Sequence, residues 1–476
     1  MTIAELIAHE WKTRLSRPAA LAALALFAAA LIHGAVHGRL QRDTRLHAIQ
    51  AHVEEVATTT AGWLDEVRAL EEEGSASGVA PWAGSPMDLT FATYLSPAPL
   101  ADFAIGQSDL LPYLGAVSLW NPDARLFARY EIADPVSLAL GAFDLGKGII
   151  FLLPLVLIVL CFDVLSGERD AGRLGFVLAQ GVHLRELLWT RLTIRAGLVL
   201  GVALVVATGA ALVPVEALHI SQRLPYFVLW SLCMLLYAGC WIGIIALVAS
   251  RNRSGEATVM PLLLAWAALN LIVPASIAAI AEAVYPSPSR LAYLAEAREV
   301  EIETELTEPN LAHRFMAEHP ELLVDHGSAI PAYVRTAFFV TSTVDEATRP
   351  ILARFEAAAA QRDAAVASLR YASPAIIVHG LFNDIAGTSF ARHHRYMTQV
   401  REFKARYAAR TGPYIVAGKR LPAGDAARLP AFRFAGDAAG VIAQRNVAVL
   451  LVLTLVNGLL LALADRNVRA IREPGD

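Results

Sequence analysis

Few residues in this chain combine the types and the spacing that catalysis requires. The run GAFDLGKG, from Gly141 to Gly148, matches the glycine and lysine positions of a phosphate-binding loop. In such a loop a serine or threonine follows the lysine and binds Mg²⁺, but here Gly148 takes that position and a long apolar segment begins at once. We therefore interpret the run as a helix start at a membrane face and predict no nucleotide site in this chain.

Metal ligands and nucleophiles are also poorly placed. The histidines in the second half of the chain include no pair at i, i+4 spacing: His313, His319, His326, His379, His393 and His394. The three cysteines lie in apolar segments and are too few for a four-ligand site: Cys161, Cys233 and Cys240. No GxSxG motif or recognisable acid/base pair of carboxylates occurs. We predict a non-catalytic protein with no metal or cofactor of its own.

Two asparagines, Asn270 and Asn457, lie near the middle of long apolar segments. A polar side chain at such a position either lines a pathway for a polar substrate or hydrogen-bonds to a neighbouring helix. The sequence does not separate these two interpretations, and both stay open.

The composition of the chain indicates a membrane protein. Hydrophobic residues make up 56% and charged residues 18%, against roughly 45–50% and 25% in soluble domains. The formal net charge of -4 provides no basic field for nucleic acid, which we exclude as a partner. Six segments are long and apolar enough to cross a lipid bilayer: 18–37, 146–164, 194–214, 225–249, 257–281 and 447–464. The sequence thus predicts an all-α polytopic protein with six transmembrane helices.

Basic residues cluster on one side of these spans, which the positive-inside rule assigns to the cytoplasm: Lys12, Arg14, Arg17, Arg169, Arg173, Arg185, Arg191, Arg251, Arg253, Arg466, Arg469 and Arg472. We expect both termini in the cytoplasm and the protein in a bacterial inner membrane. Besides the spans, the predicted order is a cytoplasmic amphipathic helix at 1–17, a periplasmic domain at 38–145, cytoplasmic segments at 165–193 and 250–256, a second periplasmic, helical domain at 282–446 and a cytoplasmic tail at 465–476.

Helical periodicity extends through much of the two outward regions. It predicts a charged helix over 39–73, followed over 74–145 by an irregular packed region or short helices. Residues 290–316 are expected to extend the fifth span outward. The run Thr343 to Glu346 fits a capping box that opens a helix, and residues 377–407 continue a helical pattern.

The segment between the second and third spans is the most informative. A charged turn, a glycine break, a short apolar helix, a second break and a basic approach to the membrane follow one another, at Glu168, Arg169, Gly172, Leu174, Gln180, Val182 and Arg185. This order predicts a cytoplasmic helical elbow that docks in a groove of a partner protein.

The elbow resembles the coupling segment of type-2 ABC transporter permeases at these seven positions, whereas Arg173, Gly181 and His183 depart from that pattern. The spans and outward regions resemble the subgroup with the domain of unknown function 3526, relatives of the copper-enzyme-maturation permeases. Further matching positions are Leu100, Ala101, Gly106 to Asp109, Pro112, Asp144, Pro154, Ser373, Pro374 and Ala386 to Thr388.

This resemblance implies a fold of type-2 ABC exporter type with two large, mainly helical periplasmic insertions. It also implies two separate ATPase subunits, which bind ATP and Mg²⁺ and contact the seven elbow residues, and a second permease that is a copy or a paralogue. We expect an exporter subunit that couples hydrolysis to substrate movement. The alternative is a mechanotransmission complex, in which nothing crosses the membrane and the periplasmic domains act on a periplasmic or outer-membrane partner.

Overall fold

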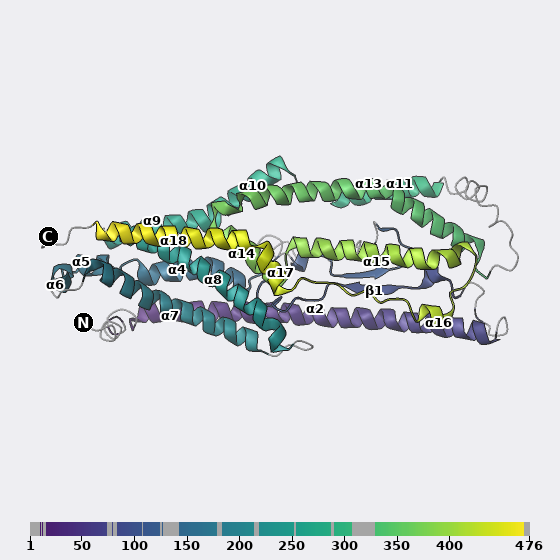
Figure 1. Cartoon of the computed structure of the whole chain (residues 1–476), viewed down its shortest axis with the longest axis horizontal. Helices are drawn as coiled ribbons and strands as arrows, with labels where there is room; N and C mark the ends of the chain where they lie inside the picture. The colour runs from purple at the N-terminus through teal and green to yellow at the C-terminus, as the bar shows by residue number, and fades with distance from the viewer. Residues whose placement is uncertain are drawn as a thin grey trace.

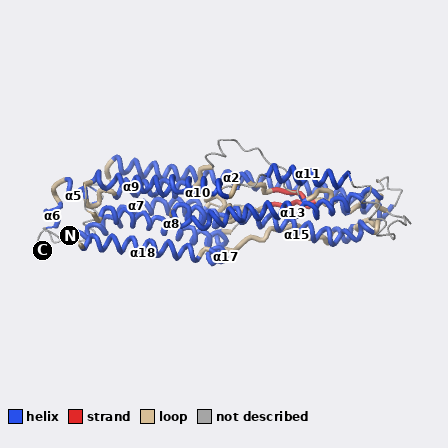
Figure 2. Tube along the Cα trace, turned by 90° about the horizontal axis from the view of Figure 1, so that it is seen from above, coloured by secondary structure: helices blue, strands red, loops and turns tan. Residues whose placement is uncertain are grey.

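The computed structural model describes residues 10, 12, 16–73, 79, 83–106, 108–123, 126, 142–178, 183–213, 219–251, 254–286, 290–306 and 329–470. This part of the chain is elongated and mostly helical (Figure 1). A bundle of helices forms one end, and a narrower extension of helices and two strands forms the other (Figure 2). Helix α2 begins and helix α18 ends at the outer tip of the bundle, which we call the elbow end.

Six helical segments in the described chain are long and apolar enough to cross a membrane. Five of these segments contain the bundle helices α2 (Pro18–Glu73), α4 (Leu145–Cys161), α7 (Leu184–Leu212), α8 (Ile220–Ala249) and α18 (Val447–Arg469). The remaining segment consists of α9 (Gly255–Ala267), the π-helix η6 (Ala268–Ile272) and α10 (Val273–Val284). The predicted class, an all-α protein with six long apolar helices, is confirmed.

Helix α2 joins the predicted first span and the predicted charged helix into one element of 56 residues. It packs against α4 and α7 in the bundle and then continues along the extension (Figure 1). Glycine permits a close approach where the two parts meet: a Cβ on Gly38 would lie 2.0 Å from the carbonyl oxygen of Asp102. At about 1.5 Å per residue, α2 is about 84 Å long and connects both ends of the molecule.

The extension contains the short elements η3 (Pro86–Asp88), β1 (Phe91–Tyr94), η4 (Ser108–Leu110) and β2 (Leu114–Val117). Strands β1 and β2 pair antiparallel, with Phe91 opposite Val117. The remaining helices are α11 (Arg290–Leu306), α13 (Ala332–Leu369), α15 (Phe390–Val416) and α16 (Ala423–Ala426). The hairpin of β1 and β2 lies within residues 74–145, for which the sequence predicted irregular structure or short helices.

Helix α13 begins at Ala332, so the prediction that Thr343 to Glu346 opens a helix was wrong. Asp345 lies inside this helix, and its carboxylate accepts a hydrogen bond from Lys404 of α15 at 2.7 Å. Lys404 also reaches Asp123, at 2.8 Å. Burial raises the pKa of Asp345, and the charge of Lys404 opposes that shift. An acidic residue inside the predicted capping motif therefore pairs with a cation between two helices.

The other helical predictions for the second outward region change in detail. Helix α10 ends at Val284 and α11 begins only at Arg290, so the two are separate helices. The pattern over 377–407 divides into α14 (Pro374–Ala386) and α15, because Gly387 adopts a left-handed conformation with φ 68° and ends α14.

A group of polar contacts joins the bundle to the extension where the two meet. Arg223, at the start of α8, contacts both carboxylate oxygens of Asp102, at 2.7 and 3.0 Å. The same guanidinium donates to the carbonyls of Ala211 and Val213 at the end of α7, at 3.1 Å each. Asp144 caps α4 by accepting from the amide of Lys147 at 2.7 Å. These charged side chains therefore bond to carbonyls at the end of α7 and an amide at the start of α4, groups that often lack a partner within their own helix.

The chain also turns back into the bundle. Helix α13 leads through η8 (Arg370–Ala372) into α14, which packs against α8 and α4. The ring of Phe382 in α14 stacks on Trp230 of α8, with 4.7 Å between centroids. Helix α17 (Ala439–Arg445) then leads into α18. Residues of the predicted second outward domain therefore form part of the bundle.

Helices α13 and α14 form a hairpin that returns into the bundle, which we call the returning hairpin. It is attached to the π-helix of the fifth span. In η6 the amide of Val273 bonds to the carbonyl of Ala268, five residues back, which leaves the carbonyl of Leu269 free of that amide. The hydroxyl of Ser373 donates to this Leu269 carbonyl at 2.5 Å. Ser373 also accepts a hydrogen bond from Ala375 and caps α14. The Ser373 side chain therefore provides a donor for a free carbonyl of the fifth span and caps the start of α14.

We predict that Ser373→Ala destabilises the protein by about 1–3 kcal/mol, since it removes a helix cap and leaves a buried carbonyl without a donor. Thermal unfolding of the purified chain in detergent measures the effect. Ser342→Ala is the control, because the Ser342 hydroxyl is exposed and bonds only within α13, to the Phe338 carbonyl. Equal melting temperatures for the two variants would contradict the proposed attachment.

Candidate coupling site

The elbow consists of α5 (Ser166–Asp170) and α6 (Leu174–Leu178), which project from the elbow end of the bundle (Figure 1). Gly172 separates the two helices with φ 69°. No atom lies within 4 Å of the position that its Cβ would take. The turn therefore requires glycine for its backbone conformation and not for lack of space.

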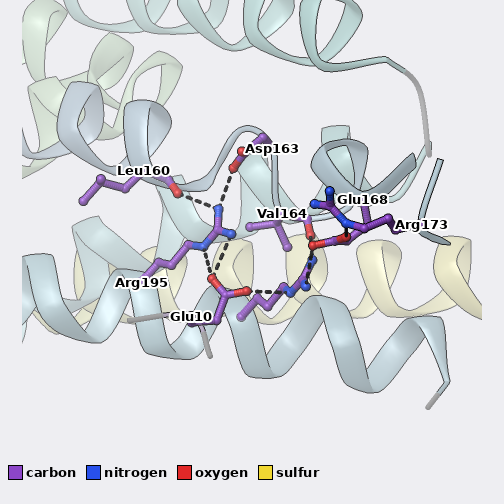
Figure 3. Close-up of polar contacts among 8 residues, drawn as sticks. Glu10, Leu160, Asp163, Val164, Glu168, Arg173 and Arg195 are labelled. Atoms are coloured by element: carbon purple, nitrogen blue, oxygen red, sulfur yellow. Dashed lines mark hydrogen bonds and ion pairs between the residues drawn. The ribbon is translucent and has the colours of Figure 1, made fainter. Parts of the chain in front are cut away.

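Glu168 attaches the elbow to the bundle. Its Oε1 lies 3.1 Å from Nη2 of Arg191 on α7, and its Oε2 lies 2.9 Å from Nε of Arg173 (Figure 3). The side chain of Glu168 is mostly buried, whereas Arg173 is largely exposed. One carboxylate therefore holds the turn of the elbow on one side and the third span on the other.

The same cations extend the network to the N-terminal part of the chain. Arg191 Nε lies 2.7 Å from one oxygen of Glu10, and Arg195 Nη2 lies 2.9 Å from the other. Arg195 also contacts Asp163, at the end of the second span, at 2.6 Å (Figure 3). The side chains of Glu10, Arg191 and Arg195 are 1–4% exposed. The carboxylates of Glu10, Asp163 and Glu168 thus balance three guanidinium groups, those of Arg173, Arg191 and Arg195, with Glu10 at the centre.

Two further contacts connect the elbow to the fifth and sixth spans. Asp170 accepts a hydrogen bond from the amide of Gly255, at the start of α9, at 2.9 Å. A carboxylate at a helix N-terminus is favourable because it meets free amides and the positive end of the helix dipole. Arg185 contacts Asp465 of α18 at 2.5 Å, and Trp189 donates to the same carboxylate at 3.0 Å. The elbow therefore contacts the third and fifth spans directly, and α7 connects it to the sixth span through Arg185 and Trp189.

The surface of the elbow suits a protein partner. Phe176 on α6 is 78% exposed, and Arg169 and Gly175 are also exposed. Leu174 is half-buried. An exposed aromatic residue beside charged side chains is typical of an anchor that fills a pocket in a partner. The exposed Phe176 and the buried Glu168 therefore lie on the two short helices of the same elbow, α6 and α5.

The structure brings most of the predicted elbow residues together. Glu168, Arg169, Gly172 and Leu174 belong to the elbow, and Arg185 lies at the start of α7. Gln180 and Val182 lie outside the described residues.

The two intramembrane asparagines lie in other parts of the bundle and hydrogen-bond between helices. Asn270 Oδ1 is 2.9 Å from the hydroxyl of Tyr237 on α8. Asn457 donates to the Leu236 carbonyl, also on α8, at 2.8 Å. Gly239 permits this second contact, because a Cβ there would lie 3.1 Å from the Asn457 amide.

Sequence reasoning did not select Glu10, Asp163, Arg191 or Arg195 as partners. A signal was available: Arg191 and Arg195 are four residues apart and so share a helix face, at the end of an apolar span where a buried charge needs a counter-charge. Their carboxylate partners come from distant segments, which pattern alone does not pair.

The remaining candidates for chemistry have structural roles in the described chain. Lys147 of the glycine–lysine run donates to the Ala142 carbonyl at 2.7 Å, and α4 begins at Leu145. Among the described residues, no group of three or more His, Cys, Asp or Glu side chains could hold a metal ion. His393 lies 2.9 Å from the Pro112 carbonyl. His313, His319 and His326 lie outside the described residues.

Comparison with known proteins gives one family match. Residues 290–435 match the model of a family described as a domain of unknown function, DUF3526. The match covers α11, α13, α14, α15 and the returning hairpin, and it supports the predicted DUF3526 subgroup. No curated protein and no solved structure matches the chain.

We predict that Arg195→Met destabilises the protein by about 3–5 kcal/mol, because it leaves buried Glu10 and Asp163 without their shared cation. Arg185→Met is the matched control: Arg185 is 50% exposed, and its pair with Asp465 contributes at most about 1 kcal/mol. Thermal unfolding in detergent compares the two variants. A loss for Arg195→Met no larger than for the control would show that the network adds no stability.

Proposed function

We propose that this chain is the membrane-spanning permease subunit of an ATP-driven ABC transporter, acting as an exporter. A separate ATPase hydrolyses ATP with Mg²⁺, and the chain itself contains no catalytic site. Two ATPase subunits would bind two permeases, either two copies of this chain or this chain and a paralogue. The elbow receives the movement of the ATPase and passes it to the spans.

The observation that carries this proposal is the position of Glu168. It lies on α5, next to α6 along the chain, and is ion-paired to Arg173 between the two helices and to Arg191, which shares Glu10 with Arg195. A partner that seats Phe176 would therefore push against a charged network and not against a flexible loop. Because buried ion pairs depend strongly on distance, small displacements of the elbow would be transmitted to α7.

The proposal places the elbow end in the cytoplasm of a bacterium and the extension in the periplasm. Described basic residues at the elbow end agree with the positive-inside rule, namely Arg169, Arg173, Arg185, Arg191, Arg251, Arg466 and Arg469. Helix α18 ends there, so the C-terminus is assigned to the cytoplasm together with the N-terminal segment that contains Glu10. Relatives of the copper-enzyme-maturation permeases remain the proposed wider group.

A second function is favoured by the continuity of α2. This helix has 56 residues and contacts α4 and α7 in the bundle and β1, β2 and α16 in the extension. A rigid helix of this length would convert a tilt of the first span into a large displacement of the extension. The protein would then work as a mechanotransmission subunit that acts on a periplasmic or outer-membrane partner, without moving a substrate.

We predict that Phe176→Asp weakens ATPase association by about thirtyfold, the effect of losing an aromatic anchor worth about 2 kcal/mol. Glu168→Gln should retain association but lower ATP-dependent function, since the contact surface remains and its connection to α7 is lost. Pulldown of the tagged chain from its native membrane, with an ATPase assay, measures both. Tyr333→Asp, at a site 57% exposed on the extension, is the control. Unchanged ATPase recovery with Phe176→Asp would rule out α6 as the docking surface.

The two functions predict different results in sealed vesicles that contain the purified complex. An exporter gives ATP-dependent movement of a compound across the membrane. A mechanotransmission subunit gives no such movement, but ATP changes the protease sensitivity of the extension. Movement of a compound that Glu168→Gln abolishes would favour the exporter and count against the second function.

A further inference from the structure

A cavity of about 880 Å³ lies between α13 and the helices α10, α14 and α15. Its volume falls within the roughly 300–1,000 Å³ that is typical of ligand sites. Its lining includes residues at the end of α13 and the start of α14, namely Val366, Ala367, Ile376 and Ile377. None of the residues singled out for the proposed coupling role lines it.

One wall of this cavity belongs to helices that are candidate membrane spans. Pro274, Ile277, Ala278 and Ala281 of α10 line it, together with Val449 of α18. Other side chains of the same fifth span are exposed apolar groups, Leu271, Ile272, Ile280 and Val284 among them. In a membrane these exposed apolar side chains would contact lipid, and the helix that bears them also forms the cavity wall that an acyl chain would meet.

Arg370 contributes a positive charge to the lining, and its Nη2 donates to the hydroxyl of Tyr371 at 3.2 Å. Its Nε is buried and has no hydrogen-bond partner within the part of the chain that the structure describes. The guanidinium lies over the ring of Tyr371, 5.1 Å from the centroid. By contrast, Arg362 in the same lining pairs with Glu282 at 2.7 Å. The lining carboxylate Asp363 is seven residues from Arg370 along α13, about 10 Å.

Arg370 is half-buried, and it lies close in sequence to a contact with the fifth span. It precedes by three residues Ser373, whose hydroxyl reaches the Leu269 carbonyl in the middle of the fifth span, Gly255–Val284. A charge at such a level is unfavourable unless a counter-charge is near, and intramembrane arginines therefore mark functional positions. Guanidinium groups bind phosphate well because their planar N–H donors match the phosphate oxygens.

We propose that this cavity binds an anionic phospholipid from the surrounding membrane, with its phosphate paired with Arg370 and an acyl chain against the wall formed by α10. Binding requires that the fifth span lies in a membrane, but it does not require an ATPase partner. The site therefore goes beyond the proposed coupling role and is tested separately from it.

The test uses the full chain in phosphatidylcholine nanodiscs that contain a small fraction of phosphatidylglycerol with a photoreactive acyl chain. Mass spectrometry locates the labelled peptides. We expect labelling of the cavity faces of α10 and α13, reduced about tenfold by Arg370→Gln, the loss expected for one charge-assisted contact. Arg370→Lys should retain most of it. Photoreactive phosphatidylcholine should label these faces more weakly and be insensitive to Arg370→Gln.

Neighbouring alanines provide a matched control on α10. Both are exposed, but Ala278 lines the cavity and Ala279 does not. Ala278→Trp should fill the site and abolish cavity labelling, while Ala279→Trp should leave it intact. The exposed face of α2 around Leu26 reports ordinary contact with lipid. Equal labelling by both lipids, no effect of Ala278→Trp, or displacement by inorganic phosphate alone would overturn the proposal.

Discussion

The pairing of buried charges at the ends of apolar helices is the constraint on which the rest of this structure depends. Glu10 forms ion pairs with both Arg191 and Arg195 and accepts a hydrogen bond from Arg195, and Asp163 and Glu168 complete the balance. Each of these charges would be strongly unfavourable alone, because desolvation of an isolated ion costs several kcal/mol. Their mutual compensation fixes the N-terminal segment, the second span and the third span in one arrangement. The elbow is held in place as a consequence.

Polar groups at helix ends are also paired at the junction between the bundle and the extension. Arg223 joins Asp102 to the last carbonyls of α7, and Asp144 caps α4 while it accepts from the amide of Ile105 at 2.9 Å. Farther inside the bundle, beside Asn270, Ser373 satisfies the Leu269 carbonyl that the π-helix leaves free. The bundle is therefore closed by polar contacts at both ends, and between them apolar packing and hydrogen bonds to Asn270 and Asn457 suffice.

Much of this architecture was predictable from the sequence. The six apolar segments and the elbow residues from Glu168 to Leu174 depend on local composition and on glycine, which patterns reveal well. The returning hairpin was not predicted, because α14 is only 13 residues long, too short for a span, and its sequence resembles that of a packed outward helix. The capping box from Thr343 to Glu346 was wrongly predicted because the helix already begins at Ala332, and the pairing of Asp345 with Lys404, far along the chain, is not visible in the local pattern.

A photocrosslinking residue in place of exposed Gly175 on α6, introduced in native membranes, tests the central claim most directly. The account predicts a covalent product with an ATPase that contains a phosphate-binding loop. A second probe in place of exposed Ala360 on α13 should not give this product. Crosslinking to lipid alone at Gly175, or capture of the ATPase only from Ala360, would contradict the elbow as the site that receives the movement of an ATPase.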